Sequence, residues 1–111
     1  MANYNAAQAF TIPRHIRAKD GVNAQAMSDT VTLTYSSSQY QILTLTAVSA
    51  KTCMLPAVKN GAYFYIKNAA GSNQPINVND PSTGGTVSTI TAGQGVLVVC
   101  DGSAWYEIIK A

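Results

Sequence analysis

The stretch TVTLTY at residues 30–35 alternates strictly between threonines and apolar side chains. Successive side chains of a β-strand point to opposite faces, so this alternation predicts a strand with Val31, Leu33 and Tyr35 on one face. The stretch YQILTLT at residues 40–46 repeats the pattern. Strands with one apolar and one polar face are typical of a sheet that covers a core on one side. These two stretches therefore indicate a β-protein.

Six further short stretches extend this reading to the C-terminus. We expect strands at residues 51–56, 62–68, 74–80, 86–91, 96–100 and 105–110. Turn signals such as Asn60-Gly61 and Asp101-Gly102 separate them. Eight short, evenly spaced strands without a helical segment predict an all-β, jelly-roll-like sandwich. Short connections favour antiparallel pairing, because parallel neighbours need a crossover of a dozen residues or more.

The same alternation predicts which side chains fill the core between two sheets. We expect burial of Leu33, Leu43, Leu45, Phe64, Ile66, Val98 and Ile108. Cys53 and Cys100 lie in the apolar runs TCMLP and VLVVC. In a chain without a secretory signal, such cysteines are typical of buried free thiols, although a disulfide between them stays open.

The first 27 residues show no sustained period of either strand or helix. We therefore predict an N-terminal arm at residues 1–27 and a β-sandwich domain at residues 28–111. The arm also contains the only basic cluster of the chain. Its charged residues alternate with apolar ones, which favours docking on a protein partner over a solvated tail. The arm residues expected to bind are Phe10, Ile12, Arg14, Ile16, Arg17 and Lys19.

Composition excludes several classes of protein. A hydrophobic content of 47% with a net charge of +2 argues against disorder. No apolar run approaches the ~18 residues of a membrane span, and the N-terminus lacks the pattern of a signal peptide. We therefore expect the protein to be synthesised in the cytoplasm. Charged residues make up only 11%, and a surface so poor in charge is poorly soluble unless a partner covers it.

The residues that carry enzyme chemistry are sparse. His15 is the only histidine, and it lies in the arm, without the rigid orienting partner that a general base requires. Asp29, Asp80 and Asp101 sit at strand ends or turns, where aspartate commonly bonds the local backbone. Zinc needs about four ligands, and the chain has too few residues that could serve. The glycine-rich stretches lack the strand–loop–helix order of a phosphate-binding loop. We expect neither an enzyme nor a metal or cofactor site.

Two kinds of ligand remain as weaker alternatives. Three basic residues in the arm make a small electrostatic footprint, so nucleic-acid binding is disfavoured. Tyr40, Tyr63, Tyr65 and Trp105 could line a carbohydrate-binding face, since aromatic rings stack on sugars. The favoured interpretation is that most of these rings pack in or over the sandwich, with Trp105 at the edge of the core.

The order of motifs over roughly residues 50–110 resembles a known phage module. A strand ends in Leu55-Pro56, Asn60-Gly61 opens YFYIKN, and a Thr-Ile-Thr strand, AGQGV and VCDGSAWYEI follow. This order is similar to the small jelly-roll β-sandwich of tailed-bacteriophage virion proteins, which occurs in capsid cementing proteins and in tail-fibre tips. The closing D-G-x-x-W strand is the most specific part of the resemblance, and both classes share it.

By length and plan, the chain looks most like the staple-type cementing proteins of epsilon15-like phages. It starts at Met1, we expect it to be complete, and it lacks the repeats of a fibre shaft. The resemblance implies a structural protein on the outer surface of the virion capsid, which staples neighbouring major capsid subunits. The alternative is a tail-fibre or receptor-binding tip that recognises a host surface glycan. Neither reading implies a nucleic-acid or membrane partner.

Self-association is a separate expectation, which follows from the edges of the sandwich. An open sandwich must protect its edge strands, and this chain has few charges with which to do so. We expect association through an edge or a sheet face, most simply as a two-fold homodimer.

Overall fold

The computed structural model describes residues 21–71 and 74–111, and in these residues it contains β-strands and no helix. The strands are β1 (Val22–Met27), β2 (Val31–Thr32), β3 (Tyr40–Leu45), β4 (Lys51–Met54), β5 (Tyr63–Asn68), β6 (Ile76–Asn79), β7 (Thr86–Ile90), β8 (Gly95–Cys100) and β9 (Trp105–Lys110). The all-β prediction is confirmed. All eight expected stretches contain a strand, although residues 30–35 contribute only the two residues of β2.

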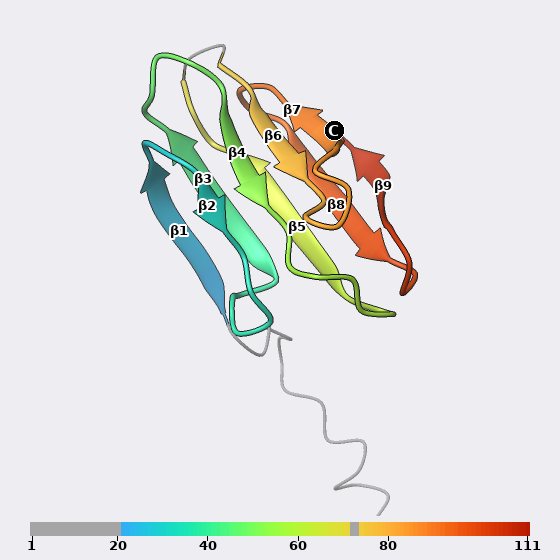
Figure 1. Cartoon of the computed structure of the whole chain (residues 1–111). Coiled ribbons are helices and arrows are strands. Elements are labelled where there is room, and N and C mark those ends of the chain that lie inside the picture. Colours follow the sequence, from blue (N-terminus) through green and yellow to red (C-terminus); the bar gives the residue numbers. More distant parts are fainter. Residues whose placement is uncertain (1–20, 72–73) are drawn as a thin grey trace, which may run out of the picture.

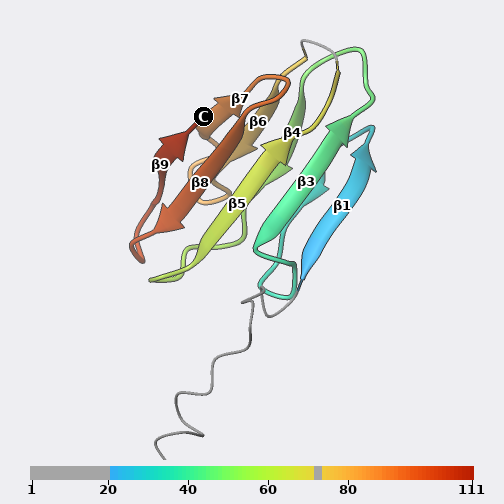
Figure 2. The ribbon, with the colours of Figure 1, turned by 180° about the vertical axis from the view of Figure 1, so that it is seen from behind.

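The nine strands form two sheets that face each other (Figures 1 and 2). One sheet has five strands in the order β1-β3-β5-β8-β9, and the other has four in the order β2-β4-β6-β7. From β1 to β6 the chain changes sheet at every strand. It then makes the β6–β7 hairpin within the four-stranded sheet and the β8–β9 hairpin within the five-stranded one.

The prediction of antiparallel pairing was wrong for four of the seven strand pairs. The pairs β1–β3, β3–β5, β2–β4 and β4–β6 are parallel, so both sheets are mixed. Between β1 and β6, the short connections join strands of opposite sheets. A parallel neighbour is therefore reached only after an intervening strand, as when β2 separates Met27 from Tyr40. That intervening strand supplies the long crossover that parallel pairing requires.

The sandwich begins before the boundary predicted from the sequence. Residues 22–27, which the sequence analysis places in the arm, form β1 and pair with β3 along their whole length. The stretch VNAQAM lacks an apolar alternation because β1 is an edge strand. Only Met27 at its end is fully buried, so the other inward positions can be polar.

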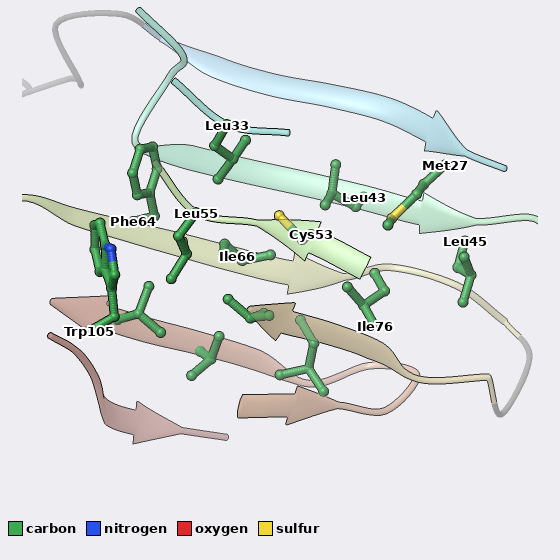
Figure 3. Close-up of a cluster of buried hydrophobic side chains, with 14 of the residues drawn as sticks. Met27, Leu33, Leu43, Leu45, Cys53, Leu55, Phe64, Ile66, Ile76 and Trp105 are labelled. Carbon is green, nitrogen blue, oxygen red and sulfur yellow. The ribbon is translucent and has the colours of Figure 1, made fainter. Parts of the chain in front are cut away.

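The core lies between the sheets and draws on both (Figure 3). Six of the expected core residues are buried: Leu33, Leu43, Leu45, Phe64, Ile66 and Val98. Cys53 and Cys100 are also buried and are free thiols, as predicted. Burial raises the pKa of Cys53 to about 12. At neutral pH this thiol therefore stays protonated and acts as a small apolar side chain.

Ile108, which the sequence analysis places in the core, is 54% exposed. A β-bulge explains this correction, because Leu97 lies opposite Ile109 whereas Val98 lies opposite Glu107. Ile108 is thus the extra residue between two paired positions, and the alternation of β9 shifts by one residue after it. The inward positions of β9 beyond Trp105 are consequently taken by Glu107 and Lys110.

Candidate functional site

The five-stranded sheet carries an apolar row on its outer face. Side chains of paired residues lie side by side on one face of a sheet. The registers of four successive pairs therefore align one residue from each strand. These residues, which we call the outer row, are Val22, Tyr40, Tyr65, Leu97 and Ile109. With strands about 4.8 Å apart, the row is about 19 Å long.

Shorter rows flank the outer row on both sides. On one side, Tyr63 pairs with Val99 and Val99 with Tyr106. On the other side, Ile42 lies between Ala24 and Lys67. We call the whole surface the apolar face, defined by its large apolar residues Val22, Tyr40, Ile42, Tyr63, Tyr65, Leu97, Val99, Tyr106 and Ile109.

Most of the exposed large hydrophobic residues of the described chain belong to this sheet. Eight of the ten lie on its strands, with exposed fractions between 38% and 58%, and only Tyr35 and Val48 lie elsewhere. Monomeric proteins seldom expose a contiguous apolar patch larger than a few hundred Å², and a larger one marks an interaction site. The apolar face is the candidate functional site because it gathers most of the exposed large hydrophobic side chains of the described residues.

Strands that carry apolar residues at both their inward and their outward positions create this surface. In YFYIKN, Phe64 and Ile66 point into the core, while Tyr63 and Tyr65 point out. In β3, Leu43 and Leu45 are inward whereas Tyr40 and Ile42 are outward. One buried face is enough to hold a strand in a sandwich. The fold of a single chain therefore does not require the second apolar face.

Charge is nearly absent from the apolar face. Lys67 is the one charged residue among the described outward positions of the five-stranded sheet. Its ammonium donates a hydrogen bond of 2.7 Å to the backbone carbonyl of Gly93, at the turn before β8. This bond draws the charge toward the end of the sheet, and the lysine stem adds to the apolar cover.

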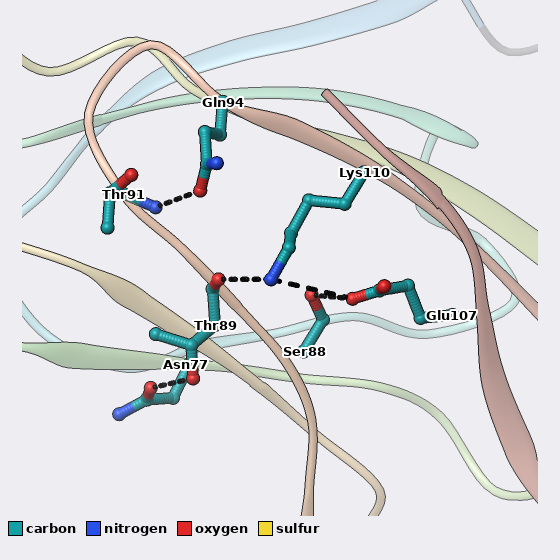
Figure 4. A network of polar contacts seen from close by, with 7 residues as sticks. All are labelled: Asn77, Ser88, Thr89, Thr91, Gln94, Glu107 and Lys110. Atoms are coloured by element: carbon teal, nitrogen blue, oxygen red, sulfur yellow. Dashed lines mark hydrogen bonds and ion pairs between the residues drawn. The ribbon is translucent and has the colours of Figure 1, made fainter.

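The outer face of the four-stranded sheet is polar by contrast. The registers of β4, β6 and β7 align Thr52, Asn77 and Thr89. The Thr89 hydroxyl and the Asn77 side-chain oxygen are 2.9 Å apart and hydrogen-bonded (Figure 4). The two outer faces thus differ in chemistry, and most of the exposed large hydrophobic side chains lie on the five-stranded sheet.

The aromatic residues considered as an alternative carbohydrate-binding face are brought together only in part. Tyr40, Tyr63 and Tyr65 share the apolar face, but Trp105 is buried on the opposite side of the same sheet. Its indole N–H donates to the Pro56 carbonyl at 3.0 Å, and its ring lies 5.9 Å from that of Phe64. Trp105 is therefore a core residue and is unavailable to a ligand.

The D-G-x-x-W motif serves the fold. One carboxylate oxygen of Asp101 accepts the backbone N–H groups of Ser103 and Ala104, which lowers the pKa of this carboxyl. Gly102 has a φ of +97°, and a Cβ there would lie 3.2 Å from that of Asn60. The turn after β8 thus packs on the Asn60-Gly61 turn before β5.

Asp80 likewise has a structural task. Burial raises its pKa, but hydrogen bonds from the Ser82 hydroxyl and backbone, and from the backbone of Trp105, outweigh burial and lower it. This carboxylate therefore stabilises the turn after β6 through the Ser82 hydroxyl and backbone N–H. Of the three turn aspartates considered in the sequence, Asp29 also bonds locally, to the Thr30 N–H at 2.8 Å.

The arm residues predicted to bind a partner cannot be compared with this surface. Phe10, Ile12, Arg14, Ile16, Arg17 and Lys19 lie outside the described residues. The sequence analysis did not select Val22, Ile42, Tyr106 or Ile109, which the structure adds to the site. The available signal was the run of strands that are apolar in both phases, YFYIKN and VLVVC.

Within residues 21–71 and 74–111, no three His, Cys, Asp or Glu residues lie together as a possible metal site. No helix in this part of the chain is long and apolar enough to cross a membrane. Comparison of the chain with protein-family models, with curated proteins and with solved structures gives no match.

Proposed function

We propose that this chain is a structural, non-enzymatic virion protein that binds the outer surface of a bacteriophage capsid and cements neighbouring major capsid subunits. The apolar face is the observation that carries the proposal. It extends over all five strands of one sheet and holds a single charged residue, Lys67. Such a surface suits a protein partner, because its contacts are broad, mostly apolar and nearly without charge.

The motif order along residues 50–110 supports the choice of partner. It resembles phage virion modules, and among them the cementing proteins act by covering capsid subunits. The facing sheets and the closing β8–β9 hairpin support kinship with their jelly-roll modules. The four parallel strand pairs are a departure from the antiparallel jelly roll.

Cementing follows from mass action. A protein that binds the assembled shell but not its separated subunits stabilises the shell by its binding free energy at every site. Apolar contacts contribute roughly 25 cal/mol for each Å² buried. A face that spans five strands therefore stabilises each site by several kcal/mol before the costs of association.

The N-terminal segment adds a second contact in this proposal. Phe10, Ile12, Arg14, Ile16, Arg17 and Lys19 precede the sandwich in the sequence. The sandwich begins at Val22, which is also the first member of the outer row. A capsid subunit that covers the apolar face at β1 is therefore adjacent to the point where the basic segment joins the domain.

The three tyrosines favour one alternative, a receptor-binding tip that recognises a host glycan. Tyr40, Tyr63 and Tyr65 present their rings on one face, and the rings of Tyr40 and Tyr65 are stacked. Sugar sites combine such rings with several converging polar groups. The only charged group on this face, Lys67, is bonded to a backbone carbonyl. The apolar face therefore favours a protein partner over a glycan.

Binding to capsids stripped of this protein tests the proposal. Tyr65→Thr and Ile42→Thr keep good strand formers but remove apolar area from the face. We expect each to weaken co-sedimentation with stripped capsids at least tenfold, about 1.4 kcal/mol. Thr89→Val on the other sheet is the matched control and should bind as wild type.

Two outcomes would overturn the capsid assignment. Wild-type protein that fails to bind stripped capsids but binds host surface polysaccharide would identify a receptor-binding tip. Unchanged capsid binding by both threonine variants would remove the apolar face from the binding site. Densitometry of purified virions separates the two classes independently, since a cementing protein is present in many more copies than a fibre tip.

A further inference from the structure

The two sheets have four edge strands, and three of them are protected. An exposed edge is a template for pairing with another chain, and proteins block it by shortness, bulges, charges or cover. Strand β2 has only two residues. Strand β7 is flanked by β9, whose Glu107 accepts a hydrogen bond from the Ser88 hydroxyl at 2.6 Å (Figure 4). Strand β9 carries the bulge at Ile108 and two charged residues.

Within residues 21–71 and 74–111, strand β1 has none of these protections. Its sequence, VNAQAM, contains no charge and no proline. Its register with β3 continues without a bulge from Val22 to Met27. It is also one of the longest strands, with six residues. Among the edges of the described chain, β1 is therefore the one that remains open to pairing.

The backbone of β1 shows which groups face outward. The Met27 carbonyl accepts the Thr46 N–H at 2.9 Å, as the parallel register with β3 requires. Backbone groups alternate in direction along a strand, so Gln25 and Asn23 also bond to β3. The N–H and C=O groups of Val22, Ala24 and Ala26 therefore point away from the sheet. Alternating donors and acceptors at this spacing are complementary to another β-strand.

Side-chain hydrogen bonds fix β1 in an extended conformation that can pair with another strand. The Asn23 side-chain N–H donates to the amide oxygens of Gln25 at 2.8 Å and Gln41 at 2.7 Å. Gln41 in turn donates to the Ser38 carbonyl at 2.8 Å. This network fixes β1 from the inner side, where a cleft of about 390 Å³ opens between β1 and β2. The outward side chains near the middle of β1, Ala24 and Ala26, are small and do not obstruct a neighbour.

We infer that β1 pairs antiparallel with β1 of a second copy of this chain, about a two-fold axis. Like strands pair antiparallel through such an axis, so one open edge makes a closed dimer. The absence of charge on β1 lets two identical edges approach without repulsion. Pairing joins the two five-stranded sheets into one sheet of ten strands. Each Val22 lies at the joined edge, so the two apolar faces become one continuous surface.

This dimer goes beyond the capsid-binding proposal and does not rest on it. Its test is Ala24→Pro, because proline removes an N–H that points away from β3 and is tolerated at such edge positions. Ala24→Thr keeps the N–H and is the matched control. Sedimentation velocity should show a two-chain species for wild type and Ala24→Thr. For Ala24→Pro we expect at least tenfold weaker association with unchanged circular dichroism.

A second variant covers the case in which Ala24→Pro does not fold. Ala26→Lys places a charge at the same edge and should give the same loss of the dimer. Wild-type protein that stays monomeric at about 0.1 mM would overturn the inference. So would a dimer that survives both Ala24→Pro and Ala26→Lys, since its interface would lie elsewhere. If the β1 amides of monomeric protein gain hydrogen-exchange protection only on stripped capsids, the partner strand belongs to the capsid.

Discussion

Tyr40 and Tyr65 stack on the outer face of the five-stranded sheet, with ring centroids 6.2 Å apart and ring planes inclined by 17°. They are 25 positions apart in the sequence (65 − 40) and meet because β3 and β5 are parallel neighbours in which these two residues are paired. The stack lies in the middle of the outer row. Parallel pairing, which the sequence analysis did not expect, thus builds the centre of the candidate site.

The tyrosine stack should be energetically coupled. A double-mutant cycle with Tyr40→Ala and Tyr65→Ala should give a coupling of about 0.5 kcal/mol, at the low end for aromatic pairs because both rings are partly exposed. Urea unfolding of the four proteins measures it. Tyr63→Ala combined with Tyr40→Ala is the control, because these residues are not paired in the register. Equal coupling in both cycles would contradict a specific stack.

Phe64→Ala should lower the free energy of unfolding by about 3–5 kcal/mol. Phe64 is buried between the sheets and its ring centroid lies 5.9 Å from that of Trp105, so truncation leaves a cavity beside the indole. Ile108→Ala removes a branched side chain that is 54% exposed, and we expect a loss below about 1 kcal/mol. Chemical denaturation of both variants checks the inward and outward assignment. A larger loss for Ile108→Ala than for Phe64→Ala would refute the bulge in β9.

Gly102→Ala should destabilise the protein more than Gly84→Ala does. Both glycines have positive φ, +97° and +70°, so alanine is strained at both, by about 1–2 kcal/mol. Only Gly102 also meets a neighbour, the Cβ of Asn60 at 3.2 Å, whereas nothing lies near Gly84. The difference between the two losses of stability therefore measures the contact between the Gly102 turn and the Asn60 turn. Thermal unfolding measures it, and equal melting temperatures would contradict the contact.

Stability should fall in alkaline solution partly because of Cys53. Burial raises the pKa of this thiol from 9.0 to about 12, so the folded state keeps it protonated when the unfolded state has lost the proton. Its contribution is full below pH 9 and is lost as pH rises from 9 toward 12. Cys53→Ala should flatten the decline in unfolding free energy between pH 8.5 and pH 10.5, relative to its own value at pH 7. An identical slope in both proteins would place Cys53 in contact with water.

Deletion of residues 2–19 tests the arm. The described strands begin at Val22, so the truncated chain retains all nine and should unfold at the wild-type denaturant midpoint. We expect its affinity for stripped capsids to fall tenfold or more, about 1.4 kcal/mol. Replacing Arg14 and Arg17 by alanine should weaken binding and flatten its salt dependence, because exposed charge pairs are screened by salt. Wild-type affinity after truncation would leave the apolar face as the whole binding site.

Periodicity within single strands predicted local features well. The stretch at residues 40–46 showed where β3 lies and that Leu43 and Leu45 point inward, because the side-chain period of a strand is a local property. The same reasoning missed β1. An edge strand whose inner side is partly open has little apolar pattern to detect, and VNAQAM shows none.

The sequence by itself determined eight of the nine strands, their turns and most of the core, since alternation and turn chemistry act between near neighbours. Only the tertiary structure decided how the strands were paired. Each strand could have joined either sheet. Successive strands from β1 to β6 alternate between the two sheets, so β1, β3 and β5 are parallel neighbours in one of them. The apolar face follows from that choice. Its outer row joins Val22 to Ile109 through registers that depend on long-range pairing, a property that no local pattern in the chain encodes.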